Sequence, residues 1–442
     1  MSEPSSPRTP TLGIRREDKH EWERRVPLTP DAVAELVGAG VEVTVQPSTI
    51  RAFDDTAFGE AGARVDEDLS ACDVVFAVKE IPISMFRRGG AYVFFSHTIK
   101  GQSHNMALLQ KMIDLGCTLI DYERIVDDAG KRLVFFGRHA GLAGMVDTLW
   151  AVAKRASAAG IATPFDALRL THEYADLEGV RAAFGDVAEA IARDGVPKSL
   201  APFVIGVAGD GNVSRGAQEI IDLLPVETVE PSALAALVAQ PDPPRDRIFK
   251  VVFREQDLVE PVDPAASFAL QHYYDHPEAY RSRFEAQLKH LTVLVNGIYW
   301  TSAYPRLVDK ATLQRLFAGA STPRLLVIGD IGCDIDGAVE CTVKATTPAL
   351  PIYVYDPADD SVRDGWDGPG VGMMTTDCLP CELSKEASET FTDALKPFAA
   401  AIAKADYTQP LGPDTLPAAI SRAVVVWRGE LTPDYAYLQS HL

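Results

Sequence analysis

Short apolar runs rich in β-branched residues alternate with amphipathic stretches along the first third of the chain. The runs have the length of strands and the stretches have helical spacing, which is typical of α/β proteins with mostly parallel sheets. One expected helix follows Thr29-Pro30-Asp31, where a threonine can cap it, a proline fits its first turn, and Gly38 or Gly40 can end it. The expected strands are residues 11–14, 41–45, 73–78, 91–95, 117–121 and 132–136.

A second α/β region begins at Pro202, after a stretch whose spacing predicts a long helix over 141–159 and further helical cover. The tail from about 390 contains a helical pattern and a short apolar run at 423–427. The strands expected in this second region are residues 202–207, 249–253, 291–300, 324–331 and 351–356.

This order of elements predicts an α/β protein with two doubly wound, Rossmann-like domains and an active-site cleft between them. Residues 1–10 are expected to form a flexible N-terminus. The substrate-binding and catalytic domain would comprise 11–140 with about 395–442, and the dinucleotide-binding domain would comprise 141–394.

The charge of the chain excludes two classes of partner. Its 442 residues include 42 lysines and arginines against 62 aspartates and glutamates, so the formal net charge is −20 at pH 7. Such a field repels nucleic acid and anionic membranes. No apolar stretch reaches the roughly 18 residues of a membrane span, and the first ten residues lack the apolar segment of a secretory signal. We expect a cytoplasmic protein with small-molecule substrates, and leave homo-oligomer formation open.

The six cysteines are scattered, as expected of reduced thiols, and only Cys378-Leu-Pro-Cys381 forms a close pair. Because a CxxC pair without further ligands is a weak signal, we interpret these as incidental thiols and predict no metal site.

A glycine-rich turn joins the first strand of the second region to an amphipathic helix. Glycines let the backbone approach a pyrophosphate, and the helix N-terminus offers unpaired N–H groups. Glu230, 19 residues beyond Gly211, and Glu227 are candidates for the acidic group that binds a ribose hydroxyl. Arg215 could equally face solvent or touch the 2′-phosphate of NADP(H), so these residues leave the choice between NAD(H) and NADP(H) open. The predicted cofactor loop comprises Gly209, Gly211, Asn212, Val213, Ser214 and Gly216, with Ser214 where the fingerprint has its third glycine.

Basic residues follow the strands of the first region, against the acidic background. Arg15 follows the first expected strand, and Arg132 begins another, so that both are candidates for binding carboxylates. Lys79 and His97 end two neighbouring strands, with Lys100 one turn beyond His97. A lysine and a histidine at adjacent strand ends suit proton transfer. Arg16, Arg24 and Arg25 could equally form internal ion pairs.

The residues resemble the lysine 2-oxoglutarate reductase family, the N-terminal half of aminoadipic semialdehyde synthase, related to saccharopine dehydrogenase and alanine dehydrogenase. The resemblance covers nearly the whole chain after residue 11. It rests on Arg15-Arg16-Glu17, Trp22-Glu23-Arg24-Arg25, Val78-Lys79, Phe94-Phe95-Ser96-His97-Thr98-Ile99-Lys100, Ile120-Asp121-Tyr122-Glu123, the 209–220 segment, Asn296-Gly297-Ile298-Tyr299-Trp300, Asp330-Ile331, and Glu386-Ala387-Ser388.

The resemblance implies that lysine and 2-oxoglutarate condense and that a reduced nicotinamide cofactor converts the imine to saccharopine, or the reverse. It implies an acid/base pair of Lys79 and His97, carboxylate-binding Arg15 and Arg132, a supporting Lys100, and cofactor contacts that include Asp330. Arg138-His139 and Cys333-Asp334-Ile335-Asp336 depart from the family pattern. An opine-type or amino-acid dehydrogenase with another amine or oxo acid is therefore a second hypothesis, and a catalytically silent regulatory homologue is a third.

Overall fold

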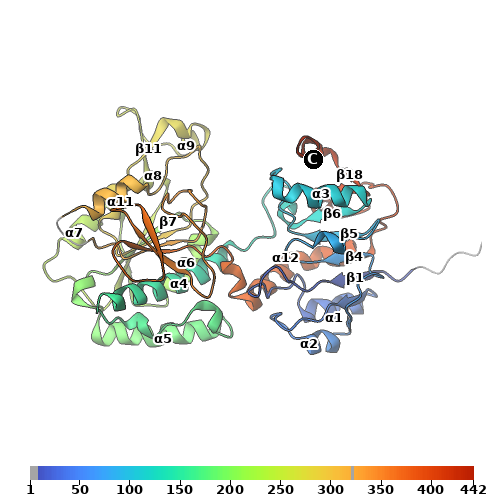
Figure 1. The fold of residues 1–442 in the computed structure, drawn as a ribbon, viewed down its shortest axis with the longest axis horizontal. Coiled ribbons are helices and arrows are strands. Elements are labelled where there is room, and N and C mark those ends of the chain that lie inside the picture. The colour runs from blue at the N-terminus through green and yellow to red at the C-terminus, as the bar shows by residue number, and fades with distance from the viewer. Residues whose placement is uncertain (1–7, 320–322) are drawn as a thin grey trace, which may run out of the picture. The chain divides into compact units, whose positions relative to one another are not determined.

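The computed structural model describes residues 8–319 and 323–442. The chain divides into two compact units (Figure 1): unit 1 comprises the residues up to Phe136 together with Ser384–Leu442, and unit 2 is Gly137–Leu383. Most of the N-terminus predicted to be flexible lies outside the described residues. Residues 384–394, which we had assigned to the second domain, belong to unit 1 because one helix, α12 (Ser384–Lys404), runs through them without a break.

Unit 1 is built on an eight-stranded sheet in the order β18-β17-β6-β5-β4-β1-β2-β3. The six N-terminal strands are parallel, whereas β17, near one edge, runs antiparallel to both of its neighbours, β6 and β18. Its strands are β1 (Thr11–Ile14), β2 (Glu42–Val45), β3 (Arg64–Val65), β4 (Val74–Phe76), β5 (Ala91–Phe94), β6 (Thr118–Asp121), β17 (Val424–Trp427) and β18 (Glu430–Leu431). Its α-helices are α1 (Pro30–Gly38), α2 (Asp55–Glu60), α3 (Ser103–Asp114), α12 and α13 (Ala418–Ser421).

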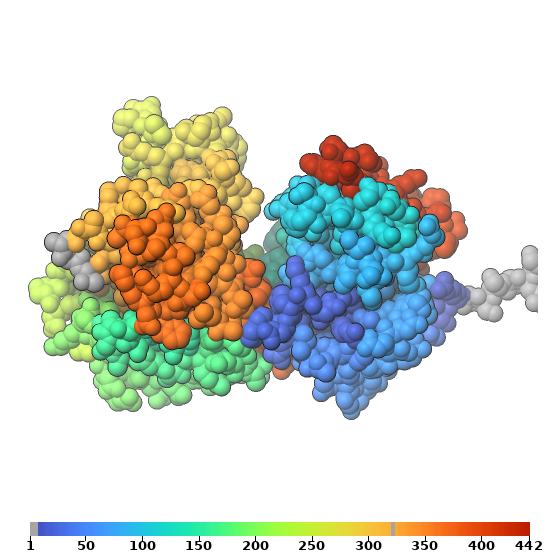
Figure 2. All heavy atoms as spheres, in the orientation of Figure 1, coloured from blue at the N-terminus to red at the C-terminus, as the bar shows by residue number. Residues whose placement is uncertain are grey.

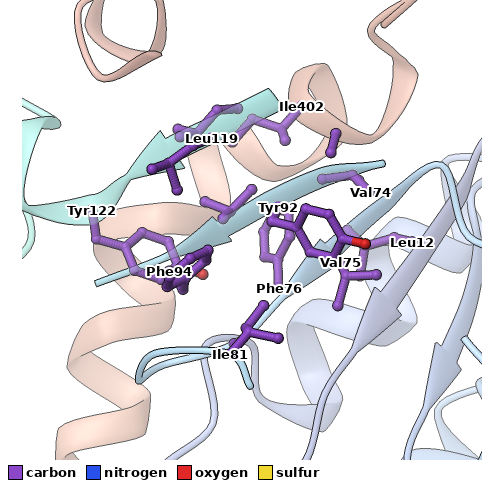
Figure 3. Packing of buried hydrophobic residues seen from close by; sticks show 14 of the residues in the cluster. Leu12, Val74, Val75, Phe76, Ile81, Tyr92, Phe94, Leu119, Tyr122 and Ile402 are labelled. Carbon is purple, nitrogen blue, oxygen red and sulfur yellow. The ribbon is translucent and has the colours of Figure 1, made fainter. Parts of the chain in front are cut away.

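The core of unit 1 joins both ends of the chain. Figure 3 shows part of it: side chains of the central strands, among them Leu12, Phe76 and Leu119, belong to the same buried cluster as Ile402 of α12. The C-terminal residues also lie on this unit (Figure 2). Tyr437 Oη donates a hydrogen bond to the carbonyl of Ile99. Residues 384–442 therefore complete the fold of the N-terminal strands.

The strand predicted at 132–136 is absent. Arg132 forms only an isolated bridge with Val126, and the residues after it run as a loop toward α4. The outer edge of β6, the last parallel strand, is already paired with β17. The apolar run is buried through its side chains instead, as Val134 shows with 1% of its surface exposed.

Unit 2 contains a second eight-stranded sheet in the order β15-β14-β16-β13-β12-β7-β9-β8, in which β14 runs antiparallel to both of its neighbours and the other pairs are parallel. The sheet strands are β7 (Val204–Ala208), β8 (Val226–Thr228), β9 (Ile248–Phe253), β12 (Val293–Asn296), β13 (Val327–Asp330), β14 (Ile352–Asp356), β15 (Ser361–Asp364) and β16 (Val371–Met374). A separate hairpin pairs β10 (Val259–Pro261) with β11 (Tyr280–Ser282). The α-helices are α4 (Gly137–Ala158), α5 (Leu177–Asp194), α6 (Asn212–Ile221), α7 (Leu234–Val238), α8 (Glu255–Leu258), α9 (Leu270–Asp275), α10 (Glu285–Leu288) and α11 (Lys310–Phe317).

The prediction of an α/β protein with two parallel-sheet-rich units is confirmed. In the part of the chain that the structure describes, no helix combines the length and the apolar character needed to cross a bilayer.

Candidate active site

Lys79 and His97 follow neighbouring parallel strands of unit 1. Strands β4 and β5 pair in register, and the amide of Phe95 extends the ladder by donating to the carbonyl of Val78 at 3.1 Å. Both residues therefore emerge at the carboxyl-terminal edge of the sheet, where parallel α/β sheets bind ligands. Within residues 8–319 and 323–442, Lys79 Nζ makes no hydrogen bond or ion pair, so its ammonium is available for chemistry.

Glu80 connects these two strand ends. One of its carboxylate oxygens lies 2.6 Å from His97 Nδ1, and the other accepts from Lys19 Nζ at 2.9 Å. Partial burial alone would raise the pKa of Glu80, but the hydrogen bonds to His97 and Lys19 outweigh it and lower that pKa to about 2. At neutral pH the ionised Glu80 thus fixes the imidazole through Nδ1 and leaves Nε2 for a substrate.

The backbone at His97 is held in an uncommon conformation. Its φ is +51°, in the left-handed region that non-glycine residues rarely adopt. Asn105 Nδ2 donates to the His97 carbonyl at 2.9 Å, and the hydroxyl of the preceding Ser96 binds both Thr98 and the buried carboxylate of Asp121. Burial raises the pKa of Asp121. These contacts hold the turn that carries the imidazole.

Glu17 performs a similar role for Lys79. Its buried carboxylate accepts from the amide of Val78 at 2.6 Å and from that of Lys79 at 3.1 Å. Burial and the nearby Glu23 raise the pKa of Glu17 to about 7, although the two amides and Arg15 oppose this shift. Sequence reasoning missed both Glu17 and Glu80. For Glu80, the sequence signal that could have revealed its role was its position directly after Lys79.

Arg132 reaches the same region from a loop rather than from a strand. Its guanidinium lies 5.6 Å from the ring centre of Phe95, and the imidazole of His97 stacks near the same ring at 6.3 Å. Arg132 Nε donates to the carbonyl of Val134, and a 3.7 Å ion pair links it to Glu123. Burial lowers the pKa of Arg132. Lys100 is exposed in the turn after His97.

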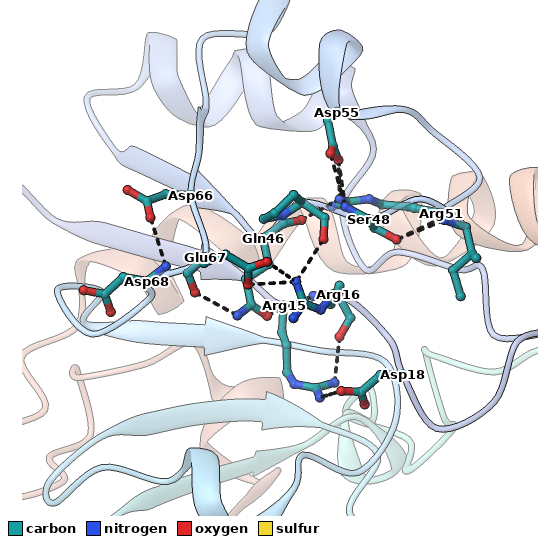
Figure 4. Close-up of polar contacts among 12 residues, drawn as sticks. Arg15, Arg16, Asp18, Gln46, Ser48, Arg51, Asp55, Asp66, Glu67 and Asp68 are labelled. Carbon is teal, nitrogen blue, oxygen red and sulfur yellow. Dashed lines mark hydrogen bonds and ion pairs between the residues drawn. The ribbon is translucent and has the colours of Figure 1, made fainter.

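Arg15 is placed differently from what its predicted role requires. Its amide donates to the carbonyl of Phe76 and so extends β1 beside β4, but its guanidinium is buried and bonded to Asp18 and to the carbonyl of Arg16 (Figure 4). Arg16 is bonded to Glu67 through both carboxylate oxygens. One terminal nitrogen of the Arg15 guanidinium, Nη2, is thus already bonded to a carboxylate of the same loop.

The other predicted basic residues form internal contacts. Arg25 and Glu23 make a buried ion pair at 2.6 Å, and Arg24 Nε donates to the carbonyl of Ile50. These contacts support the structural interpretation for Arg16, Arg24 and Arg25.

The glycine-rich loop of unit 2 has the geometry of a phosphate cradle. Gly209 has a φ of +92°, which favours glycine, and its amide donates to the carbonyl of Phe253. Gly211 is the N-cap of α6 and provides no side-chain cap, and nothing lies within 4 Å of the space a side chain there would fill. The amides of the first turn of α6, which include those of Asn212 and Val213, are thus available to the pyrophosphate of a dinucleotide.

The departure of this loop from the usual fingerprint has a packing explanation. Ser214 is buried and accepts from Gln218 Nε2, so a small side chain is accommodated there. The close approach occurs at Gly216 instead, where an added Cβ would lie 2.1 Å from the carbonyl oxygen of Arg138. An added Cβ at Gly141 would likewise lie 2.0 Å from the carbonyl oxygen of Val213. Helices α4 and α6 therefore pack backbone to backbone beneath the cradle.

Glu230 and Asp330, the two acidic residues predicted to contact the cofactor, lie in different surroundings. Glu230 is exposed beyond the end of β8, and β9 separates that strand from β7. Asp330 is buried, and its two carboxylate oxygens bind Asn296 at 2.8 Å and Thr342 at 2.5 Å. Burial raises the pKa of Asp330. In this structure Asp330 positions Asn296 rather than presenting an unoccupied oxygen.

The structure also shows local contacts for the two segments that depart from the family pattern, Arg138-His139 and Cys333–Asp336. Arg138 forms a two-pronged ion pair with Glu219 of α6, at 2.7 and 2.6 Å, and so reinforces the helix contact near the cradle. Cys333 and Asp336 both have a φ of +51°, and the Cys333 thiol donates to the carbonyl of Thr375. These contacts lie within unit 2.

The chain is similar to several known proteins. A family model described as alanine dehydrogenase/PNT, N-terminal domain, matches residues 13–143. Over 97% of its length the chain is 40% identical to alpha-aminoadipic semialdehyde synthase of Arabidopsis thaliana and 35% identical to the mitochondrial form of Rattus norvegicus, and it spans 41% and 48% of those proteins.

A relative of comparable length is saccharopine dehydrogenase (NAD(+), L-lysine-forming) of Neurospora crassa, 28% identical over 87% of this chain and 89% of the relative. Among solved structures, an L-alanine dehydrogenase matches with a TM-score of 0.61 and 16% identity over 98% of both chains. At that identity the match shows the fold alone.

Proposed function

We propose that this chain, a homologue of alpha-aminoadipic semialdehyde synthases and a member of the saccharopine dehydrogenase-like superfamily, catalyses the NAD(P)-dependent condensation of L-lysine with 2-oxoglutarate to saccharopine, or the reverse. The observation that carries the proposal is the pair of adjacent strand ends bearing Lys79 and His97, linked through Glu80. The chain spans less than half of the two semialdehyde synthases, so only this step is assigned to it.

The reaction divides between the residues of unit 1 and the cofactor. A nicotinamide dinucleotide, with its pyrophosphate held by the glycine-rich loop, would supply or accept the hydride. Lys79 and His97 transfer the protons that carbinolamine formation and loss of water require. Glu80 keeps the imidazole oriented, and Glu17 keeps the Lys79 segment in place. Because saccharopine has three carboxylates, Arg132, Lys100 and Arg15 serve as its cationic partners, Arg15 after release of Asp18.

For the cofactor we favour NADP(H) over NAD(H), and we propose Gly209, Gly211, Asn212, Val213, Ser214 and Gly216 as the pyrophosphate loop. A cytoplasmic location also remains a prediction; relatives from rat, cow and mouse carry mitochondrial in their names.

The test is a spectrophotometric assay of the purified chain with NADPH and with NADH. Lysine plus 2-oxoglutarate should oxidise a reduced cofactor, and saccharopine should reduce an oxidised one. Other amines, paired with pyruvate or glyoxylate, identify a changed substrate. If neither cofactor reacts with lysine plus 2-oxoglutarate or with saccharopine, the proposal is wrong.

A further inference from the structure

In the unit 2 sheet, the strand beside β7, which leads into the cofactor loop, is not the next strand in the sequence. In a dinucleotide-binding sheet, the strand beside the glycine-loop strand ends next to the adenosine ribose. The strand that follows α6 in the sequence is β8, but the strand that pairs with β7 on that side is β9, with Ala208 opposite Phe253. Strand β8 lies beyond β9, about 10 Å from β7 at ordinary strand spacing.

This order changes which residue occupies the ribose position. Spacing along the chain favours Glu230, which follows the outer strand. The fold instead puts the residue after β9 there, and that residue is Arg254. The end of β9 touches the cofactor loop directly, because the amide of Gly209 donates a hydrogen bond to the carbonyl of Phe253, the residue before Arg254, at 2.8 Å.

The Arg254 side chain lies at the glycine-rich loop and is available to a ligand. Its Nε is 3.6 Å from the carboxylate of Asp210, the residue between the two loop glycines, and its side chain is 62% exposed. An exposed ion pair at that distance contributes little, so a phosphate can displace Asp210. The amide of Arg254 donates to Asp257 at 3.0 Å, which fixes the start of the side chain.

The acidic residue next to Arg254 is engaged elsewhere and is not arranged as in an NAD(H) site. A carboxylate at the end of the adjacent strand would accept from the ribose 2′-hydroxyl and repel a 2′-phosphate. Glu255, the next residue, accepts instead from Tyr274 Oη at 3.0 Å. Arg215, the other cation raised by the sequence, is exposed in the first turn of α6.

Resting on the proposed nicotinamide-dependent function, we infer that Arg254 binds the 2′-phosphate of NADP(H) and sets the preference of this chain for NADP(H) over NAD(H). A guanidinium suits a phosphate dianion because it offers paired N–H donors. Arg254 here is a specificity residue and takes no part in hydride transfer.

Direct binding to the full chain tests this inference without turnover. Dissociation constants for NADPH and NADH are measured by nicotinamide fluorescence, and those for adenosine 2′,5′-bisphosphate and 5′-AMP by calorimetry. Arg254→Ala should weaken NADPH and the bisphosphate by roughly tenfold or more, and leave NADH and 5′-AMP within about twofold. Arg247→Ala is the matched control, because Arg247 precedes the same strand at its opposite end and pairs with Asp246 and Glu227.

Three results would overturn the inference: equal effects of Arg254→Ala on NADPH and NADH, discrimination lost in Arg215→Ala but kept in Arg254→Ala, or a wild-type chain that binds NADH at least as tightly as NADPH. In each case saccharopine formation with NADH would leave the proposed function intact. A wild-type chain that binds neither nucleotide would overturn both.

Discussion

At the scale of single residues, the two proposed acid/base groups differ in how they are held. His97 is bonded through Nδ1 to Glu80, whereas the Lys79 side chain is held only through its backbone. We predict that Lys79→Met and His97→Gln each lower turnover by roughly 100-fold or more, the contribution of a positioned proton donor or acceptor. Steady-state rates with saturating substrates measure this. Lys111→Met, at an exposed position on α3, is the control. A loss below about twofold in either variant would refute the assigned role.

Glu17 gives a prediction for stability against pH. Its pKa in the folded chain is raised from 4.5 to about 7, so the native state favours the protonated form. The associated stability is complete below pH 4.5 and is lost as the pH rises through 7. Relative to Glu17→Gln, the wild type should therefore lose about 2 kcal/mol of unfolding free energy between pH 5 and pH 8.

Denaturant unfolding at the two pH values measures the difference. Glu21→Gln, at an exposed position in the same loop, should change the free energy little at either pH. A gap between wild type and Glu17→Gln that is equal at pH 5 and pH 8 would contradict the interpretation.

The sequence predicted the residues at strand ends better than it predicted their partners. Lys79 and His97 could be found because apolar runs end directly before them. Their carboxylate partners Glu17 and Glu80 could not, since the direction of a side chain depends on tertiary packing. The pairing of Arg15 with Asp18 was missed for the same reason.

At the scale of elements, the contact between α4 and α6 depends on two glycines. An added Cβ at Gly216 would lie 2.1 Å from the carbonyl of Arg138. We predict that Gly216→Ala destabilises the chain by about 1–3 kcal/mol, because the helices must separate, and weakens nucleotide binding at the loop. Gly185→Ala, in the open middle of α5, should stabilise by about 0.5–1 kcal/mol.

Thermal unfolding and nucleotide titration of both variants test this pair. If Gly216→Ala were as stable as wild type and bound nucleotide equally well, the backbone contact would have no energetic role.

Most strands with β-branched runs were predictable, and the exceptions have clear causes. The run 132–136 has strand composition but meets an edge already paired with β17, which lies nearly 300 residues away in the sequence. Conversely, β16 (Val-Gly-Met-Met) has a weak strand pattern, and the side chains of Ile352 and Arg155 pack closely against Gly372. Long-range pairing decides both cases, and local periodicity cannot reveal it.

At the scale of the whole molecule, each unit has its own apolar core, one in unit 1 and two clusters in unit 2. We predict two calorimetric transitions rather than one. NADPH at about 100 times its dissociation constant should stabilise unit 2 alone, by about 2.7 kcal/mol, and move only its transition upward. Scanning calorimetry with and without NADPH measures this. One transition that shifts as a whole would show that the units unfold together.

The return of residues 384–442 to unit 1 also affects the order of events during synthesis. Unit 2 is continuous in sequence and can fold as it leaves the ribosome, whereas β6 of unit 1 lacks its partner β17 until the last segment emerges. At roughly 5–20 residues per second, translation of unit 2 takes roughly ten to fifty seconds. During that interval the sheet that carries Lys79 and His97 has an open edge at β6 and no α12, and is most exposed to misassociation.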